Sequence, residues 1–262
     1  MWAQRATAAA GYGRVPEFNT DLVAGAIAAF VVGLGKGGLS SMGTLAVPIM
    51  AFAMSPVRAA AILAPVFVFS DVFALWFYRR HFSVRNLAIL LPAAVAGIVT
   101  GWSVAAMISD AGVSILVGVI GIGYCVNNWR LRRHALRPHD ADAPRGLLWG
   151  YVLGFASFVS HAGGPPFQVY VMPQRLPKQV YAGTAAIAFA VVNAVKLIPY
   201  WALGQLTTPN LGLSAVMLLP ALIGTQVGAR LVRVISERAY YAFLELALFA
   251  VSVDLIVRGL RG

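Results

Sequence analysis

The chain has 262 residues, of which 60% are hydrophobic and only 11% are charged, and its mean hydropathy is +0.78. A soluble domain of this size cannot cover so much apolar surface, so the composition excludes a soluble globular protein and indicates an integral membrane protein. The apolar stretches are nearly continuous and do not alternate with polar residues, which excludes a transmembrane β-barrel. We therefore predict an all-α integral membrane protein, a bundle of transmembrane helices.

The net charge of +11 would suggest a nucleic-acid partner in a soluble protein. Here the basic residues stand in short segments between apolar stretches, where Lys and Arg set membrane topology. We therefore expect the lipid bilayer, and no nucleic acid, as a partner. Cys125 is the single cysteine, and no Cys/His cluster suggests a metal. No metal, cofactor or catalytic residue is predicted.

The first half of the membrane region spans residues 21–130. Residues 1–20 lack the apolar core of a signal peptide and are expected to form a retained N-terminal tail. Segment 21–34 is shorter than the roughly 20 residues that a spanning helix needs. We predict a helical hairpin broken at its glycines, followed by three transmembrane helices. The apolar segments of this half lie at 21–34, 38–54, 58–79, 86–107 and 112–130.

The second half spans residues 147–258, after a basic cytoplasmic linker at 131–146 and before a C-terminal tail at 259–262. Segment 165–173 is too short to cross a bilayer, so this half also reads as a broken hairpin plus three transmembrane helices. Its apolar segments lie at 147–161, 165–173, 180–202, 211–232 and 239–258.

The two halves align with each other as internal repeats. The matches follow one another in order at offsets of roughly 121–128 residues, which chance would not produce. They pair Gly37–Gly38 with Gly163–Gly164, Asp71 with Asn193, Tyr78 with Tyr200, Gly97 with Gly224 and Gly101 with Gly228.

The basic residues predict how the repeats are oriented. Thirteen of them lie in the segments at 79–85, 130–145, 174–179 and 230–238, which we place together on the cytoplasmic face. Each half crosses an odd number of times, so the second half must enter the membrane from the opposite side. We predict two inverted-topology repeats with periplasmic termini and a binding site near the midplane, where the repeats meet.

Lys36 is the first candidate for chemistry, because it lies in a glycine-rich break of an apolar run. A lysine at the membrane centre costs about 2.5–3.5 kcal/mol, so such a residue usually faces a cavity or a partner. Free N–H groups at half-helix ends favour anions. Alternatively, the glycines permit close helix packing and Lys36 reaches an interface. The predicted anion site takes Gly35, Lys36, Gly37, Gly38, Ser40 and Ser41 from this break.

His161 holds the matching place in the second half, just before a run of two glycines and two prolines. Prolines lack the N–H donor, so they end one half-helix and can start the next. A histidine here binds substrate, carries a proton near neutral pH, or is a hydrogen-bonded structural residue. The substrate-binding candidates from this break are His161, Gly163, Gly164, Pro165 and Gln168.

Asp71 is the only acid well inside the full-length segments of the first half. Asn193, at its matching place, shares a helix face with Lys196, and both are candidate substrate-binding residues. Asp71 could pair with Lys196 across the bundle or, like His161, serve proton coupling. Alternatively, Lys196 reaches the membrane interface.

The two breaks carry a family resemblance. The stretches GLGKGGLSSMGTLAVP and VSHAGGPPFQVYVMP, with PKQVYAGTAAIAFAVVN after the second, resemble the TauE/SafE sulfite exporter family, also known as the 4-toluene sulfonate uptake permeases. The likeness covers roughly residues 20–258, but PVRAAAILAP in the first half lacks the Gly-Thr pair found at Gly183–Thr184. The resemblance implies a bacterial inner-membrane transporter of sulfite, or of sulfonates such as sulfoacetate or taurine-derived anions.

Several functions stay open on the sequence alone. The leading one is a secondary transporter that works by alternating access on a small anion, with protons as a possible coupling ion and a monomer or homodimer as the assembly. The alternatives are an anion channel, a carrier for small carboxylates, an intramembrane hydrolase using Ser40 or Ser41 with His161, and a scaffold subunit. There is no nucleotide-binding loop that would indicate ATP-driven transport.

Overall fold

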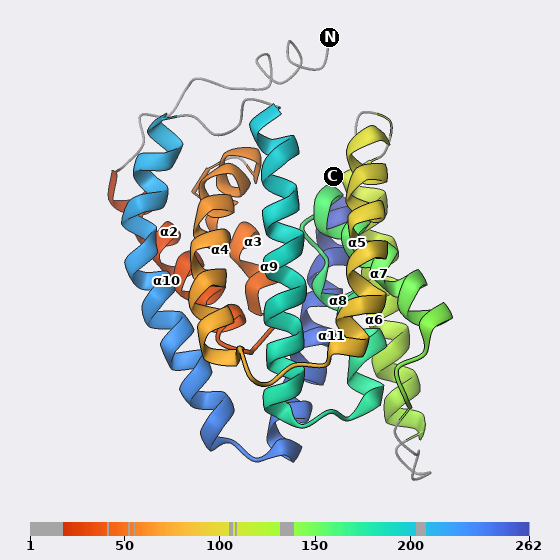
Figure 1. The fold of residues 1–262 in the computed structure, drawn as a ribbon. Helices are drawn as coiled ribbons and strands as arrows, with labels where there is room; N and C mark the ends of the chain where they lie inside the picture. Colours follow the sequence, from red (N-terminus) through yellow and green to blue (C-terminus); the bar gives the residue numbers. More distant parts are fainter. Residues whose placement is uncertain are drawn as a thin grey trace.

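The computed structural model describes residues 18–40, 42–51, 53–54, 56–104, 107, 109–131, 139–202 and 208–261, and every regular element in these ranges is a helix. The prediction of an all-α fold is therefore confirmed (Figure 1). The helices are α2 (Phe18–Lys36), η1 (Met42–Leu45), α3 (Ala46–Ala51), α4 (Pro56–Tyr78), α5 (Val84–Val104), α6 (Asp110–Leu131), α7 (Ala143–Val159), α8 (Gly164–Val171), η2 (Met172–Gln174), α9 (Lys178–Ala202), α10 (Thr208–Val234) and α11 (Glu237–Arg261).

Within the described residues, six helices are long and apolar enough to cross a membrane, and they match the six predicted crossings. Their outward faces carry large apolar side chains, such as Val72, Ile198 and Leu219, each more than half exposed. Such a surface suits lipid and would be costly in water. The chain is therefore a multi-pass membrane protein. The six candidate spans are Ala61–Tyr78, Val84–Val104, Ala111–Arg130, Lys178–Pro199, Asn210–Val234 and Glu237–Arg261.

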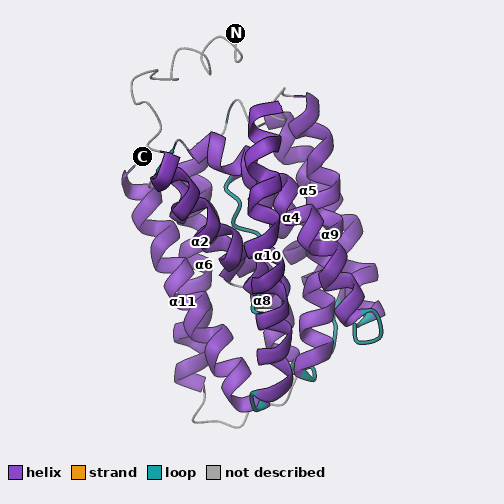
Figure 2. Cartoon of the chain, turned by 90° about the vertical axis from the view of Figure 1, so that its left-hand side faces the viewer, coloured by secondary structure: helices purple, strands orange, loops and turns teal. Residues whose placement is uncertain are grey.

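Each half begins with a helix that stops inside the bundle. Helix α2 ends at Lys36, and the chain turns back through η1 and α3, while α7 ends at Val159 and the chain turns back through α8 and η2. Loop segments consequently lie between the helices inside the bundle as well as at its ends (Figure 2). Both interruptions coincide with the glycine-containing breaks in the sequence.

The two halves of the chain pack against each other more than on themselves. The most extensive helix contacts are α5 with α7, α2 with α10, α6 with α11 and α4 with α9. Each of these pairs joins a helix of the first half to one of the second. The halves therefore share one interior. The break between α2 and α3 and the break between α7 and α8 both lie in it.

Glycines bring the backbones of these helix pairs close together. A Cβ at Gly224 in α10 would lie 2.2 Å from the Phe30 carbonyl oxygen of α2, and a Cβ at Gly97 in α5 would lie 2.1 Å from the Tyr151 carbonyl oxygen of α7. Small residues allow this approach, as in other membrane helix pairs. The matched glycines Gly97 and Gly224 therefore lie where α5 crosses α7 and where α10 crosses α2.

The basic segments meet at one end of the bundle, the lower end in Figure 1. The Ser83 N–H donates to Thr184 Oγ1 at 2.9 Å, the His139 N–H donates to the Pro173 carbonyl at 3.3 Å, and Lys178 Nζ donates to the Arg233 carbonyl at 3.0 Å. The last bond joins two of the four segments that we grouped by charge, and the other two bonds tie the remaining segments to α9 and η2. Arg132, Arg133 and Arg137 of the linker lie outside the described residues.

Candidate functional site

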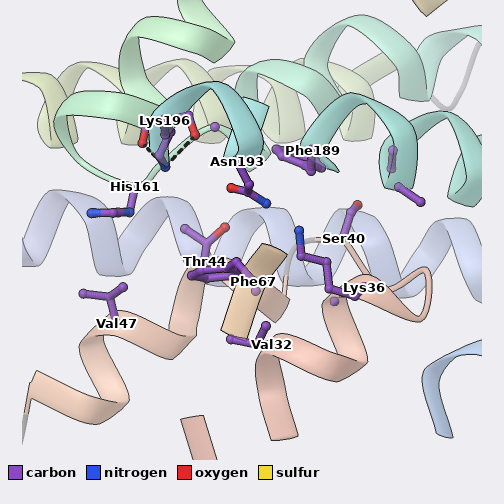
Figure 3. A pocket seen from close by; sticks show the side chains of 17 residues that line it. Val32, Lys36, Ser40, Thr44, Val47, Phe67, His161, Phe189, Asn193 and Lys196 are labelled. Carbon is purple, nitrogen blue, oxygen red and sulfur yellow. Dashed lines mark hydrogen bonds between the residues drawn. The ribbon is translucent and has the colours of Figure 1, made fainter. Parts of the chain in front are cut away.

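A cavity lies where the two breaks face each other, and it offers about 60 Å³ for the centres of water-sized molecules. Since one water needs about 10–15 Å³ of such space, the cavity has room for several waters or for one small anion. Figure 3 shows Lys196, Asn193 and Phe189 on one side and Lys36, Phe67 and Thr44 on the other. The lining residues are Val32, Gly35, Lys36, Ser40, Gly43, Thr44, Val47, Phe67, Ser157, His161, Gly163, Gly164, Ala185, Ala186, Phe189, Asn193 and Lys196.

At the first break, tyrosine hydroxyls hold the unwound backbone. Gly38 adopts φ +116°, and an added Cβ would lie 2.6 Å from the Tyr78 hydroxyl, so only glycine fits there. The Tyr78 hydroxyl donates to the Gly37 carbonyl at 2.6 Å, and the Tyr240 hydroxyl donates to the Gly38 carbonyl at 2.7 Å. Helices α4 and α11 thereby satisfy two carbonyls that lipid could not.

Lys36 forms a buried ion pair at the end of α2. Its Nζ lies 2.5 Å from Asp71 Oδ1 on α4, and the Asn193 amide on α9 donates to Asp71 Oδ2 at 2.8 Å. Lys36 Nζ also lies 5.3 Å from the centre of the Phe67 ring, within reach of a cation–π interaction. Lys36 therefore does not reach an interface. The suggested pairing of Asp71 with Lys196 is wrong, because the end of α2 places Lys36 nearer to the carboxylate.

The second break turns at a residue other than glycine. His161 adopts φ 54°, and the N–H groups of Ser160 and Ala162 both donate to the Ala156 carbonyl near the end of α7. Helix α8 then begins at Gly164, followed by two prolines that have no N–H. Gly163 and Gly164 line the cavity, so the positive end of the α8 dipole faces it.

The starts of the two returning helices lie side by side. A Cβ at Gly164 would lie 2.9 Å from Thr44 Oγ1 in η1. The Thr44 hydroxyl and the Gly164 N–H therefore face one space. Pro165 and Pro166 have no N–H and the Phe167 N–H donates to the Gly163 carbonyl at 3.4 Å, so the start of α8 offers a ligand the N–H groups of Gly163 and Gly164.

Lys196 extends from α9 towards the end of α7. Its Nζ donates to the Ser157 carbonyl at 2.7 Å and to Ser157 Oγ at 3.2 Å, and the residue is only 5% exposed. The alternative in which Lys196 reaches the membrane interface is wrong, because the side chain turns inward. Ser157 holds the ammonium group at the cavity wall.

The cavity gathers most of the residues that we predicted as a binding site. Ser41 lies outside the described residues. Gly37, Gly38, Pro165 and Gln168 are described but do not line the cavity. Those at the cavity are Gly35, Lys36, Ser40, His161, Gly163, Gly164, Asn193 and Lys196.

Gly37 and Gln168 do not line the cavity because they face other parts of the protein. A Cβ at Gly37 would lie 2.5 Å from the Thr225 carbonyl oxygen of α10, so this glycine serves helix packing, as the alternative interpretation held. Gln168 is fully buried on α8 and points elsewhere. Both lie close in sequence to lining residues, but on other faces of the chain.

Sequence reasoning missed nine lining residues. Four have polar or aromatic side chains, Thr44, Phe67, Ser157 and Phe189, and the other five are Val32, Gly43, Val47, Ala185 and Ala186. Ser157 stands four residues before His161, and Phe189 stands one turn before Asn193, so helical spacing could have found both. Thr44 and Phe67 carried no comparable signal. Ser40 and His161, which a hydrolase would need together, lie at different ends of the cavity (Figure 3).

The charged side chains that line the cavity are lysines. Two lysines line the cavity, and its described lining contains no Asp or Glu. The nearest carboxylate is that of Asp71, which bonds to Lys36 and Asn193. Among the described residues, no group of three or more His, Cys, Asp or Glu side chains could hold a metal.

Comparison with known proteins identifies the family of the chain. Residues 23–255 match the family model described as Sulfite exporter TauE/SafE. Comparisons with curated proteins and with solved structures gave no match. The matched region covers most of the chain and contains both breaks and every residue that lines the cavity. The chain therefore belongs to the TauE/SafE sulfite exporter family, a family of membrane anion transporters.

Proposed function

We propose that this protein is a secondary transporter of small sulfur oxyanions, sulfite or short sulfonates, across the bacterial inner membrane, and that the cavity between the breaks binds the anion. One observation carries the proposal. Lys36 from the first half and Lys196 from the second reach the same buried cavity. Buried ammonium groups are costly in a membrane, and they are kept where they pair with a partner or bind a ligand.

The other lining groups suit a sulfur oxyanion. Such an anion spreads its charge over several oxygens and needs donors from more than one direction. The Thr44 hydroxyl and the N–H groups of Gly163 and Gly164 can add such donors to the two lysines. Phe67 and Phe189 provide apolar surface for a short organic group on a sulfonate. The volume of the cavity favours sulfite or a sulfonate with few carbons.

The pattern of helix contacts supports alternating access by inverted repeats. If α2 to α6 and α7 to α11 are equivalent series, the α2–α10 contact corresponds to α7–α5, while α4–α9 and α6–α11 each join equivalent helices. A pseudo-two-fold axis through the cavity would generate this pattern. We assign the end with the basic segments to the cytoplasm and both termini to the periplasm. Cysteine labelling should then place 131–146 and 203–210 on opposite sides.

Counterflow in proteoliposomes tests the proposed function. Vesicles preloaded with unlabelled sulfite should take up labelled sulfite faster than empty vesicles, because a carrier must return its site across the membrane. An anion channel would show no such trans-stimulation. Ligands that bind the folded protein should also raise its unfolding temperature, so sulfite and sulfonates should do so more than matched carboxylates. Absence of both flux and binding for every sulfur oxyanion would contradict the proposal.

Proton coupling is part of the same proposal. Asp71 and His161 are the two groups that we assign to proton coupling, and both are buried or half-buried beside a lysine of the site. Sulfite uptake into vesicles with an imposed pH gradient should change in rate when the gradient is reversed. An equal rate in both gradients would show that transport is not coupled to protons.

A further inference from the structure

Asp71 lies behind the wall of the cavity. The residue is 3% exposed and does not line the cavity itself. Both carboxylate oxygens are occupied, Oδ1 by Lys36 and Oδ2 by Asn193, and these two partners do line the cavity. Asp71 is therefore placed to set the charge of the wall without contacting a ligand first.

The charges at the cavity can be counted. With both lysines protonated and Asp71 ionised, Lys36 and Lys196 contribute two positive charges and Asp71, behind the wall, contributes one negative charge, and the described lining holds no acid. One positive charge remains in a buried space. A bound monoanion balances it, whereas a dianion leaves one uncompensated negative charge, which is costly away from water.

The internal repeats explain why the cavity keeps one net positive charge. The position of Asp71 in the first half corresponds to Asn193 in the second, so only one of the two equivalent positions carries an acid. The structure brings the two side chains together at 2.8 Å. An acid at both positions would cancel the charge of both lysines, and an amide at both would leave both charges.

We propose that Asp71 is a specificity-determining residue that restricts the cavity to monoanions of the sulfonate or bisulfite class and excludes dianions of similar shape. The inference rests on the proposed function, since it concerns the anion bound at that site. Asp71 acts through Lys36 and Asn193, so it is a positioning residue for charge, and its removal should change which anion binds before it abolishes binding.

Isothermal titration of the purified full-length protein with methanesulfonate and with sulfate tests this rule. The two probes have similar size, and near neutral pH one is a monoanion and the other a dianion. The wild type should bind methanesulfonate about tenfold more tightly than sulfate, and Asp71→Asn should shift the ratio of the two affinities towards sulfate by about tenfold or more. Asp71→Glu, which keeps the charge, should keep the wild-type preference.

Two further variants separate charge from shape. Lys36→Gln combined with Asp71→Asn removes one charge of each sign, so the preference for the monoanion should return. Glu245→Gln removes a buried acid that bonds to Asn128 between α6 and α11 and does not line the cavity, so the ratio should not change.

Three results would overturn the rule. They are a wild type that prefers sulfate, an Asp71→Asn variant with an unchanged ratio, and a double variant whose ratio lies as far towards sulfate as that of Asp71→Asn. The wild-type result stands even if Asp71→Asn fails to fold. Binding of neither probe to the wild type would instead contradict the proposed function, and with it this inference.

Discussion

The two breaks reach one cavity by different local chemistry. In the first, a glycine at φ +116° turns the chain and two tyrosine hydroxyls hold the carbonyls of Gly37 and Gly38. In the second, His161 turns the chain at φ 54°, and two N–H groups share the Ala156 carbonyl. The lysine at the first break, Lys36, belongs to the break itself, whereas the lysine near the second break, Lys196, comes from α9. Two halves of similar architecture thus contribute unlike groups, so equivalent substitutions should have unequal effects.

The largest effect is expected at Lys36. Lys36→Met leaves Asp71 buried without its cation, which should lower the free energy of unfolding by about 3–5 kcal/mol and abolish sulfite counterflow. Adding Asp71→Asn to this variant should recover most of the stability but not the flux. Thermal unfolding in detergent and flux in vesicles measure the two quantities. Normal flux through the double variant would show that Lys36 does not bind the anion.

The turn residues give the next contrast. Gly38→Ala should destabilise the protein by about 1–3 kcal/mol, because the backbone is left-handed and Val232 and Ala182 crowd the added carbon within 3.0 Å. His161→Gly should change stability by about 1 kcal/mol or less, since relief of strain offsets the added chain entropy of glycine. Gly212→Ala, where an added Cβ meets nothing within 4 Å, is the control. Equal losses at Gly38 and His161 would contradict the contrast.

The tyrosine bonds to the first break should each contribute a moderate amount. Tyr78→Phe and Tyr240→Phe leave the buried carbonyls of Gly37 and Gly38 without these donors, which should cost about 1–2 kcal/mol of unfolding free energy each. Denaturation of the purified variants measures this loss. Tyr151→Phe, a change on an exposed side chain, should unfold like the wild type. Wild-type stability in both of the first two variants would mean that the first break is held in another way.

The smallest effect is expected at Ser157. Ser157→Ala removes only the longer of the two bonds to Lys196, at 3.2 Å, and keeps the backbone carbonyl at 2.7 Å. The affinity for a sulfur oxyanion should therefore fall by about two- to fivefold, equivalent to about 0.5–1 kcal/mol. Titration measures the affinity. A loss as large as that of Lys36→Met would place Ser157 in direct contact with the anion.

The class of the protein and the course of its chain could be predicted from the amino-acid sequence. Long apolar runs in lipid have one way to satisfy every backbone group within a single segment, the helix, so the six crossings could be placed from local composition. The two breaks were visible for the same reason, because glycines and prolines interrupt those runs. A charged residue inside such a break, Lys36, also indicated a buried site, because an ammonium group at membrane depth needs a partner or a ligand.

Which side chains contact one another could be seen only in the folded structure. The partner of Asp71 is Lys36 and not Lys196, and Gly37 packs on α10 while Gly35 lines the cavity. These outcomes depend on how each helix is rotated about its axis and where distant helices cross. Contacts at positions such as Gly97 and Gly224 set that rotation, and they join residues more than 50 positions apart. Such contacts cannot be predicted from the local sequence, whereas the length and polarity of each helix can.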